Sequence, residues 1–209
     1  MLLNSSRSEL LRRLDDGSTW DIIVIGGGAT GLGAAVDAAG RGYRTLLLEQ
    51  ADFASGTSSR STKLVHGGVR YLQQGNLALV REALRERHIL LMNAPHLVHD
   101  VPFVIPLYSW WERPFYGIGM ALYALLSGVH GLKHSRHLSL EETIDLIPTV
   151  RRKNLRGGIV YHDGQFDDAR LAVCLARTLA DLGGTPLNYM NVSALKAAPG
   201  QLTSVTAIE

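Results

Sequence analysis

The pattern of apolar and polar positions predicts a mixed α/β chain that opens with a parallel βαβ unit. Residues 21–49 read as a short apolar strand, a glycine-rich turn, an Ala-rich helix and a second apolar strand that ends in an acidic residue. Apolar residues at helical spacing among charged ones predict further helices over residues 77–93 and 168–182. Gly183 and Gly184 follow the second of these helices and mark its end.

Strands are expected between and after these helices. Short apolar runs predict strands at residues 101–107, 158–162 and 185–189. Prolines within the first of them indicate an edge strand or the ends of a strand, because proline cannot donate a hydrogen bond to a neighbouring strand. Residues 192–197 and 202–208 flank a Pro-Gly pair and are expected to form a hairpin.

Residues 1–20 are expected to form a short amphipathic leader helix and a linker. Ser6 and Glu9 fit a capping box at the start of this helix. Charged residues are spread through the segment, so it lacks the apolar core of a signal peptide. The apolar side of the helix comes from Leu10, Leu11 and Leu14.

Composition and charge exclude several classes of protein. Apolar residues make up 46% of the 209 residues and charged residues 19%, the profile of a folded globular chain. The formal net charge of +2 and the scattered basic residues indicate no nucleic-acid partner. Cys174 is the single cysteine, and its helical surroundings predict burial as a small apolar side chain. The histidines show no pattern typical of a metal centre, so no metal site is expected.

The turn after the first strand has the chemistry of a dinucleotide site. Gly26 permits a tight turn, Gly28 lets the backbone approach a pyrophosphate, and Gly31 lets the helix pack closely on the strand. Amide groups at the start of the helix favour phosphates. The residues of this turn that we expect to bind the cofactor are Gly26, Gly27, Gly28, Thr30 and Gly31.

Glu49 bears on the kind of dinucleotide. It follows Gly31 by 18 residues (49 − 31) at the end of the second strand, where its carboxylate can accept hydrogen bonds from ribose hydroxyls. Its negative charge would repel a 2′-phosphate, which disfavours NADP. The early position of the turn in the chain suits FAD enzymes and leaves NAD open.

A second segment, residues 55–72, is dense in hydroxyl groups and glycines and ends in basic and aromatic residues. It follows the second strand directly, so it can wrap a cofactor with backbone and hydroxyl hydrogen bonds. The basic residues near its distal end can present a cation to an anionic substrate. On its own, the same composition would also suit a surface loop.

Together these segments resemble the N-terminal part of the FAD-dependent glycerol-3-phosphate dehydrogenases. The agreement runs from about Asp21 to about Leu171, with several motifs at matching spacing. Leu32 stands where the family's first signature prefers a small residue. The matching motifs are Ile25-Gly26-Gly27-Gly28, Thr57-Ser58-Ser59, Lys63-Leu64, His66-Gly67-Gly68, Arg70-Tyr71-Leu72, Glu82-Ala83-Leu84-Arg85-Glu86-Arg87, Ala94-Pro95-His96-Leu97 and Asp167-Asp168-Ala169-Arg170-Leu171.

The resemblance implies a Rossmann-like FAD-binding domain of the glutathione-reductase and amino-acid-oxidase type, with part of an α+β cap domain that binds substrate. Residues 21–76 would begin the FAD-binding domain, residues 77–166 would be an inserted cap segment, and residues 167–209 would return to the first domain within a β-hairpin. The FAD-binding domain would then be incomplete. Residues 1–209 would be the N-terminal part of a much longer enzyme, inactive when alone.

The resemblance also implies an activity. Such enzymes oxidise sn-glycerol 3-phosphate to dihydroxyacetone phosphate, pass a hydride to FAD and deliver electrons to a quinone. Carried onto this chain, Glu49 and the glycine turn would hold the ADP half of FAD. His66 would orient or deprotonate the substrate hydroxyl, and Arg70 would bind the substrate phosphate. The residues expected at the flavin end are Ser58, Ser59, Lys63 and Leu64.

Other interpretations stay open from the residues alone. The same motifs would serve a glycerol-3-phosphate oxidase that uses oxygen, another FAD-dependent oxidoreductase, or a non-catalytic fragment. His66 also suits a structural role in which it bonds the loop backbone, and Arg70 suits a structural ion pair.

Residues 115–129 form an almost uninterrupted apolar run of 15 residues, preceded by Trp110 and Trp111. A helix that crosses a bilayer needs about 20 apolar residues, so this run is too short. Tryptophans beside a basic residue suit a helix at a membrane surface, and a buried cap-domain helix fits equally well. With the quinone that the resemblance implies, we expect a cytoplasmic location with peripheral contact at the inner face of the cell membrane. A homodimer is a further expectation.

Overall fold

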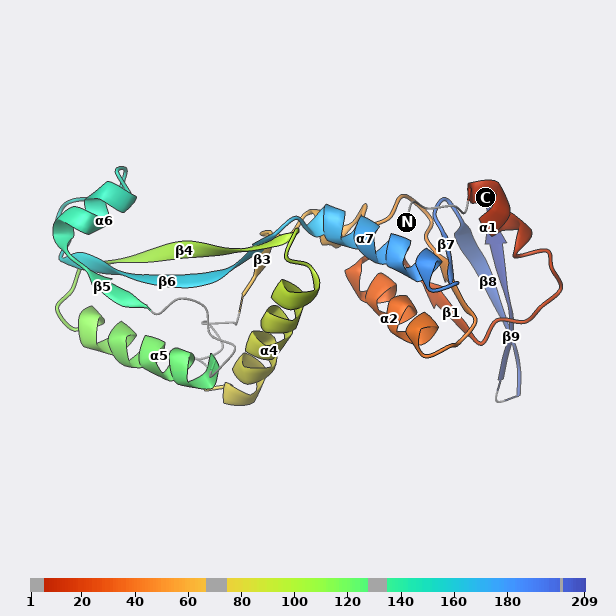
Figure 1. Cartoon of the computed structure of the whole chain (residues 1–209), viewed down its shortest axis with the longest axis horizontal. Helices are drawn as coiled ribbons and strands as arrows, with labels where there is room; N and C mark the ends of the chain where they lie inside the picture. The colour runs from red at the N-terminus through yellow and green to blue at the C-terminus, as the bar shows by residue number, and fades with distance from the viewer. Residues whose placement is uncertain (1–5, 67–74, 128–134, 200) are drawn as a thin grey trace. The chain divides into compact units, whose positions relative to one another are not determined.

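The computed structural model describes residues 6–66, 75–127, 135–199 and 201–209 (Figure 1). It divides into two compact units, the first made of Met1–Thr62 and Asp167–Glu209 and the second of Lys63–Phe166. The first boundary between these units therefore lies after Thr62, whereas the sequence predicts a boundary after residue 76. The reason is that β3 (Leu64–Val65) pairs with a long strand of the second unit, β6 (Gly157–Phe166).

The first unit is built on a parallel sheet. β1 (Ile22–Ile25), β2 (Thr45–Leu48) and β7 (Thr185–Leu187) lie in the order β1-β2-β7, and both pairs are parallel. α2 (Ala29–Gly40) connects β1 to β2. The predicted βαβ unit is thus confirmed, and β2 lies at the centre of the described sheet with every residue buried.

α2 lies beside α7 (Asp168–Asp181) (Figure 1). Leu32 is fully buried in the core that these helices share with β2, so this larger residue is accommodated against alanines of α7. Cys174 is only partly buried, which corrects the expectation of a buried thiol. The physical reason is that the core face of α7 is formed by other residues, namely Ala172, Ala176 and Leu179.

A second core of this unit brings the leader helix and a hairpin together with the sheet. α1 (Arg7–Arg12) begins after Ser6, whose hydroxyl accepts the N–H of Glu9 at 3.3 Å. β8 (Asn191–Ala198) and β9 (Gln201–Ile208) form the predicted antiparallel hairpin. The buried residues of this core are Leu10, Leu46, Leu48, Leu187 and Met190. Leu46 and Leu48 of β2 point into this core, whereas Leu47 between them packs in the core with α2 and α7.

The second unit is an antiparallel sheet. β4 (Val98–Leu107) pairs with β6 along its whole length, while β3 and β5 (Arg136–Leu138) pair with the other edge of β6. Among the described residues β4 therefore ends the strand order, as its prolines predicted. It begins three residues earlier than expected (101 − 98).

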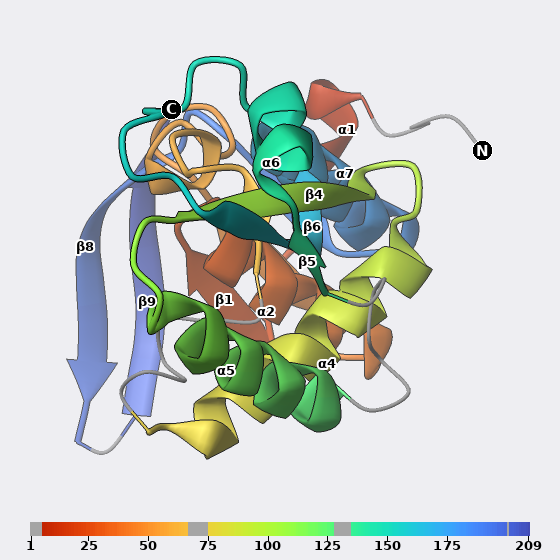
Figure 2. The same cartoon turned by 90° about the vertical axis from the view of Figure 1, so that its left-hand side faces the viewer.

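Helices lie on both faces of this sheet. α4 (Leu77–Asn93) and α5 (Glu112–Ser127) lie on one face, and α6 (Leu140–Leu146) lies on the other (Figure 2). α4 occupies the residues that its apolar spacing predicted. The core under α4 and α5 is formed by Val80, Leu84, Leu107, Met120, Tyr123 and Ile159.

A buried polar cluster interrupts this core. Arg87 Nη1 donates to Asp163 Oδ1 at 2.8 Å and to the Tyr123 hydroxyl at 3.2 Å. Burial raises the pKa of the nearby Tyr161 hydroxyl, and the negative charge of Asp163 raises it further. The cluster links α4, α5 and β6, so it fixes both helices on the sheet.

Candidate functional site

The turn between β1 and α2 holds a conformation that only glycine permits. Gly26 has a φ of 109°, and its N–H donates to the Leu48 carbonyl at 2.8 Å. A Cβ on Gly31 would collide with the carbonyl oxygen of Gly26. A Cβ on Gly27 would lie 2.8 Å from Glu49 Cβ and 2.8 Å from Phe53 Cδ1. The lack of Cβ atoms therefore lets a ligand approach the backbone amides of this turn closely.

The N-terminus of α2 supplies those amides. Gly28 is the N-cap and has no side-chain cap, and its carbonyl accepts the N–H of Leu32 at 2.9 Å. The N–H groups of Thr30 and Gly31 precede this first helical bond, so they lie outside the hydrogen bonding of the helix. Thr30 is exposed. Unused amides and the positive end of the helix dipole make this end of α2 suitable for phosphate groups.

The Glu49 carboxylate bonds directly to this turn. Its Oε2 accepts the N–H of Gly27 at 2.6 Å, and its Oε1 accepts the N–H of Ala51 at 2.8 Å. A carboxylate oxygen can accept more than one hydrogen bond, so both oxygens can still receive ribose hydroxyls. The bond to Gly27 was missed from the sequence, because a backbone donor leaves no signal in residue type.

The loop that carries Glu49 is fixed by the segment after β7. The N–H of Glu49 donates to the Leu187 carbonyl at 2.9 Å, and the N–H of Met190 donates to the Glu49 carbonyl at 2.8 Å. Tyr189 donates to the Ala51 carbonyl at 3.0 Å. The position of the Glu49 backbone is therefore set by segments more than a hundred residues away in the chain.

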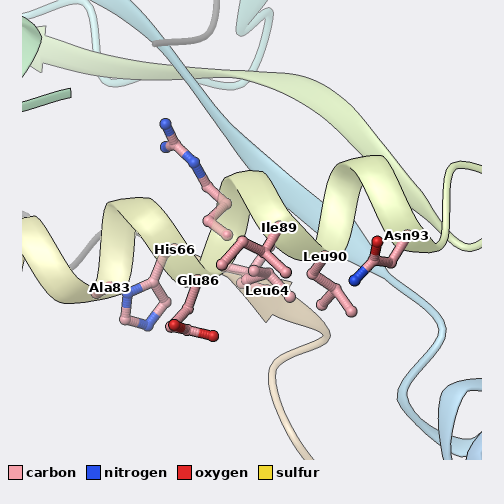
Figure 3. A pocket seen from close by; sticks show the side chains of 9 residues that line it. Leu64, His66, Ala83, Glu86, Ile89, Leu90 and Asn93 are labelled. Carbon is pink, nitrogen blue, oxygen red and sulfur yellow. The ribbon is translucent and has the colours of Figure 1, made fainter. Parts of the chain in front are cut away.

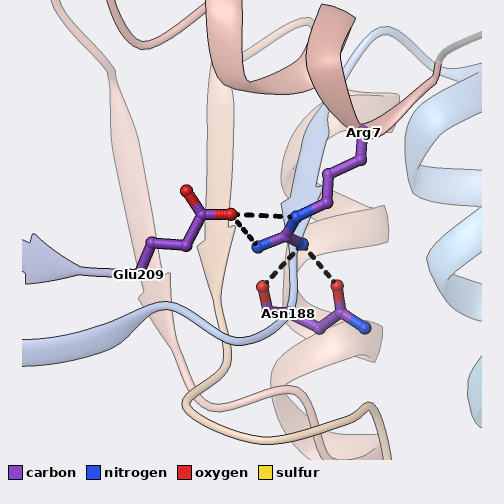
Figure 4. A network of polar contacts seen from close by, with 3 residues as sticks. All are labelled: Arg7, Asn188 and Glu209. Carbon is purple, nitrogen blue, oxygen red and sulfur yellow. Dashed lines mark hydrogen bonds and ion pairs between the residues drawn. The ribbon is translucent and has the colours of Figure 1, made fainter.

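A side-chain network extends this support to the leader helix (Figure 4). Arg7 Nη1 donates to the backbone carbonyl and to Oδ1 of Asn188, both at 2.8 Å. The Nε and Nη2 atoms of Arg7 donate to Glu209 Oε1 at 3.2 and 3.0 Å. Asn188 Nδ2 in turn donates to Asp52 Oδ1 at 2.9 Å, so the network ends in the loop after Glu49.

The hydroxyl-rich loop meets the helix end. Ser58 lies in the short 3-10 helix η1 (Thr57–Ser59), and its Oγ accepts the N–H of Ala29 at 2.9 Å. Ser59 Oγ lies 3.4 Å from the Gly56 carbonyl, to which it donates. The structure therefore brings Ser58 to the same helix end as the glycine turn. Both belong to the first unit.

The remaining candidate residues belong to the second unit. Lys63 is exposed and has a φ of 57°, and its carbonyl accepts the N–H of Phe166 at 3.0 Å. Leu64 lies on β3, and His66 follows that strand. Leu64, His66 and Glu86 of α4 line a pocket of about 480 Å³ (Figure 3). Arg70 lies outside the described residues.

A metal centre is not visible in the part of the chain that the structure describes. No three of its histidine, cysteine, aspartate and glutamate side chains are grouped so that they could hold a metal ion. The polar groups that converge at the turn of Gly26 to Gly31 are backbone amides, the Ser58 hydroxyl and the Glu49 carboxylate. This set of donors and acceptors fits a dinucleotide, with phosphates on the amides and ribose hydroxyls on Glu49.

Comparisons with known proteins agree with this geometry. The chain is 50% identical over 197 residues to the "Glycerol-3-phosphate dehydrogenase, mitochondrial" of Rattus norvegicus, covering 91% of this chain and 27% of the relative. It is 46% identical over 212 residues to the protein of the same name from Schizosaccharomyces pombe, covering 98% of this chain and 33% of the relative. The chain thus spans a third or less of the length of these relatives.

A solved structure shows the same fold. The glycerol-3-phosphate dehydrogenase from Bacillus halodurans complexed with FAD aligns with a TM-score of 0.71 and 32% identity, covering 97% of this chain and 33% of that chain. The predicted Rossmann-like FAD-binding fold and the resemblance drawn from the motifs are both confirmed. The family model described as FAD dependent oxidoreductase matches residues 21–209. The chain therefore belongs to the FAD-dependent oxidoreductase family.

Proposed function

We propose that this chain forms the FAD-binding part, and one side of the substrate site, of an enzyme that oxidises sn-glycerol 3-phosphate to dihydroxyacetone phosphate. The observation that carries the proposal is the close turn of Gly26 to Gly31 with the Glu49 carboxylate bonded to it. Relatives at 46–50% identity, named glycerol-3-phosphate dehydrogenase, support the substrate. The activity is proposed for a protein of their length, and the inactivity of residues 1–209 alone stays a prediction.

The proposed cofactor contacts follow from the donors and acceptors of the first unit. The N–H groups of Thr30 and Gly31 would donate to the pyrophosphate, and Glu49 would accept from a ribose. Bound FAD would supply the acceptor for the hydride that leaves C2 of the substrate. The residues proposed for its flavin end are Ser58, Ser59, Lys63 and Leu64.

His66 and Arg70 are the residues that we propose for the substrate. An imidazole at His66 can take the proton of the C2 hydroxyl as the hydride leaves, provided that it is neutral. Glu86 lines the same pocket and can accept the N–H of the ring nitrogen that does not take the proton, which would orient the imidazole. The guanidinium of Arg70 would bind the phosphate group with two parallel hydrogen bonds.

The catalytic proposal is tested under anaerobic conditions in a protein of the relatives' length that contains this chain. The FAD-loaded protein is mixed with glycerol 3-phosphate, and the flavin absorbance is followed. We expect bleaching by glycerol 3-phosphate and none by glycerol or by amino acids. Reduction by an amino acid, with none by glycerol 3-phosphate, would contradict the proposed substrate.

The exposed apolar side of α5 supports the proposal that the protein contacts a membrane surface. Contact with a membrane in turn supports a quinone as the electron acceptor. Met120 and Tyr123 of this helix are buried against the sheet. A second apolar stripe, with its residues four, three and seven positions apart, points away from that core. It consists of the exposed residues Trp111, which directly precedes the helix, Phe115, Ile118 and Leu125. A contiguous exposed apolar stripe marks a contact surface, and Trp110 and Arg113 at its start suit the headgroup region of a bilayer.

We do not propose that α5 spans a membrane. Within the described ranges, no helix is both long enough and apolar enough to cross a membrane. Peripheral contact through the stripe is what we propose, and a cell membrane or a mitochondrial membrane would both satisfy it. The relatives named above are mitochondrial enzymes. The cytoplasmic location and the homodimer stay predictions.

Vesicle binding tests the membrane proposal. The chain is sedimented with phospholipid vesicles that contain anionic lipid, as the wild type, as Ile118→Glu and as Met92→Glu. Ile118 is 71% exposed on the stripe, while Met92 is 68% exposed on α4, so the two variants place the same charge at equally exposed sites. We expect Ile118→Glu to lower the partition coefficient roughly tenfold or more, because one buried aliphatic side chain is lost. Equal effects of both variants would contradict the proposal.

The rate at which the reduced flavin is reoxidised tests the identity of the electron acceptor. After anaerobic reduction by glycerol 3-phosphate, a short-chain quinone or oxygen is added and the return of the flavin absorbance is timed. Faster return with the quinone is expected. Faster return with oxygen would favour the alternative of a glycerol-3-phosphate oxidase.

A further inference from the structure

Two adjacent aspartates begin α7, and they have different partners. Asp167 is the exposed N-cap of the helix, and its Oδ1 accepts the N–H of Arg170 at 3.0 Å. Asp168 follows it and is 3% exposed. A helix start needs one capping side chain, which Asp167 already supplies. The burial of a second carboxylate therefore calls for another role.

The partner of Asp168 is the hydroxyl-rich loop. Its Oδ2 accepts the Ser61 hydroxyl at 2.7 Å and the Ser61 N–H at 3.2 Å. Its Oδ1 accepts the N–H of Ala169 at 2.8 Å. Three donors and the positive end of the α7 dipole stabilise the buried negative charge. Hydrogen bonds to a carboxylate are about twice as strong as those between neutral groups, so the contact holds Ser61 firmly.

The loop is thereby fixed at two points to two helix ends. Ser58 Oγ accepts the N–H of Ala29 at the start of α2, and three residues later Ser61 is held at the start of α7. Most of the loop between residues 55 and 62 is exposed, so it has little apolar packing of its own. Its placement at the α2 end depends on these polar contacts.

We infer that Asp168 is a positioning residue for the cofactor: through Ser61 it holds the loop of residues 55–61, and with it Ser58, against the end of α2 where the FAD phosphates would lie. The inference rests on the proposed function, because it assigns the effect of Asp168 to FAD binding. It goes beyond that function, since the hydrogen bonds described for Asp168 go to Ser61 and Ala169 and not to the glycine turn or Glu49.

Three variants, each made in a protein of the relatives' length that contains this chain, test this role. Asp168→Asn keeps the shape and loses one acceptor, because an amide nitrogen cannot accept, and Ser61→Ala removes the hydroxyl donor. Asp167→Asn is the matched control, with the same change at the neighbouring position of the same helix. We expect Asp168→Asn to weaken FAD binding roughly ten- to a hundredfold, the range of a hydrogen bond to a buried charged group. Asp167→Asn should change it less than about threefold.

A second readout does not require FAD. Arg60 is exposed beside Ser61, so trypsin cleavage after Arg60 reports on opening of the loop. We expect faster cleavage in Asp168→Asn and Ser61→Ala than in the wild type or Asp167→Asn. A thermal melt of each variant shows whether the chain is folded. The double variant Ser61→Ala/Asp168→Asn should bind FAD no more weakly than Asp168→Asn alone, because both changes remove one contact.

The outcomes separate the inference from the proposed function. Equal FAD affinity and equal cleavage in Asp168→Asn and Asp167→Asn overturn the inference while wild-type FAD binding stands. Faster cleavage at Arg60 with unchanged FAD affinity also overturns it, because the loop would then open without consequence for the cofactor. A wild-type protein of the relatives' length without saturable FAD binding overturns the proposed function, and the positioning role with it.

Discussion

Arg87 and Asp163 form an ion pair inside the second unit, with Arg87 Nη1 2.8 Å from Asp163 Oδ1 and side chains 1% and 3% exposed. The two residues are 76 positions apart, on α4 and β6. This ion pair, together with the adjacent Tyr123 hydroxyl, fixes the position of α4 on the sheet. The effect of such a buried ion pair on stability is seen most clearly when one partner is removed, because the other charge then stays buried without a partner.

The first prediction concerns this pair. Arg87→Met should lower the free energy of unfolding by about 3–5 kcal/mol, because it leaves the Asp163 charge buried without its partner. The double variant Arg87→Met/Asp163→Leu should lose less than the sum of the single changes. Urea denaturation measures each value.

An exposed pair serves as the control. Arg136 and Glu142 lie 2.7 Å apart with side chains 58% and 44% exposed. Arg136→Met should cost less than about 1 kcal/mol, since exposed ion pairs are weak. If Arg87→Met lowers the free energy of unfolding no more than Arg136→Met does, the stabilising role of the buried Arg87–Asp163 pair is contradicted.

The second prediction separates two glycines of α2. Gly31→Ala should weaken FAD binding at least about tenfold, because its Cβ would displace the Gly26 carbonyl and open the turn. Gly33→Ala meets nothing within 4 Å and should stabilise the helix by up to about 1 kcal/mol, with FAD affinity unchanged. Titration with FAD and urea denaturation measure the two effects. Similar FAD affinities for the two variants would argue against a phosphate role for the turn.

The third prediction concerns pH and the start of α6. Glu142 accepts the N–H of Ser139 at 2.7 Å and pairs with Arg136, and these contacts, the Ser139 backbone bond first, hold its pKa below the ordinary 4.5. Because the pKa is lower in the folded state, the stabilisation is complete above the unfolded value and is lost as pH falls through the folded value. The stability of the wild type relative to Glu142→Gln should therefore be constant above about pH 5 and shrink below about pH 4.

Glutamine keeps the capping geometry, so this comparison isolates the charge. Urea denaturation at a series of pH values gives the difference. A stability advantage of the wild type over Glu142→Gln that grows on acidification would contradict a lowered pKa of Glu142.

The fourth prediction concerns the leader helix. Arg7→Ala removes the bonds to Asn188 and Glu209 and should lower the free energy of unfolding by about 1 kcal/mol. Arg12→Ala should change it by less than about 0.5 kcal/mol, since the Arg12 side chain bonds the Ser8 carbonyl of its own helix. Equal losses would show that the network of Figure 4 does not hold the leader.

The sequence predicted the elements whose patterns are local. The apolar spacing of α4 and the glycines of the first turn are such patterns, because each depends on residues a few positions apart. The unit boundary after Thr62 was not predictable, since β3 has two residues and no periodicity. The partners of Arg87 and Asp168 were not predictable either, because they lie 76 and 107 positions away. The outward stripe of α5 could not be told from a core stripe, as both faces of that helix are apolar.

The most direct measurement of the central claim is a titration with FAD of a protein of the relatives' length that contains this chain, followed by displacement with ADP. The claim is that the turn of Gly26 to Gly31 and Glu49 hold the ADP half of FAD. We expect this protein to bind one FAD per chain saturably and to release it to ADP, and we expect weak or no binding by residues 1–209 alone. An absence of saturable binding, or bound FAD that ADP does not displace, would contradict the claim.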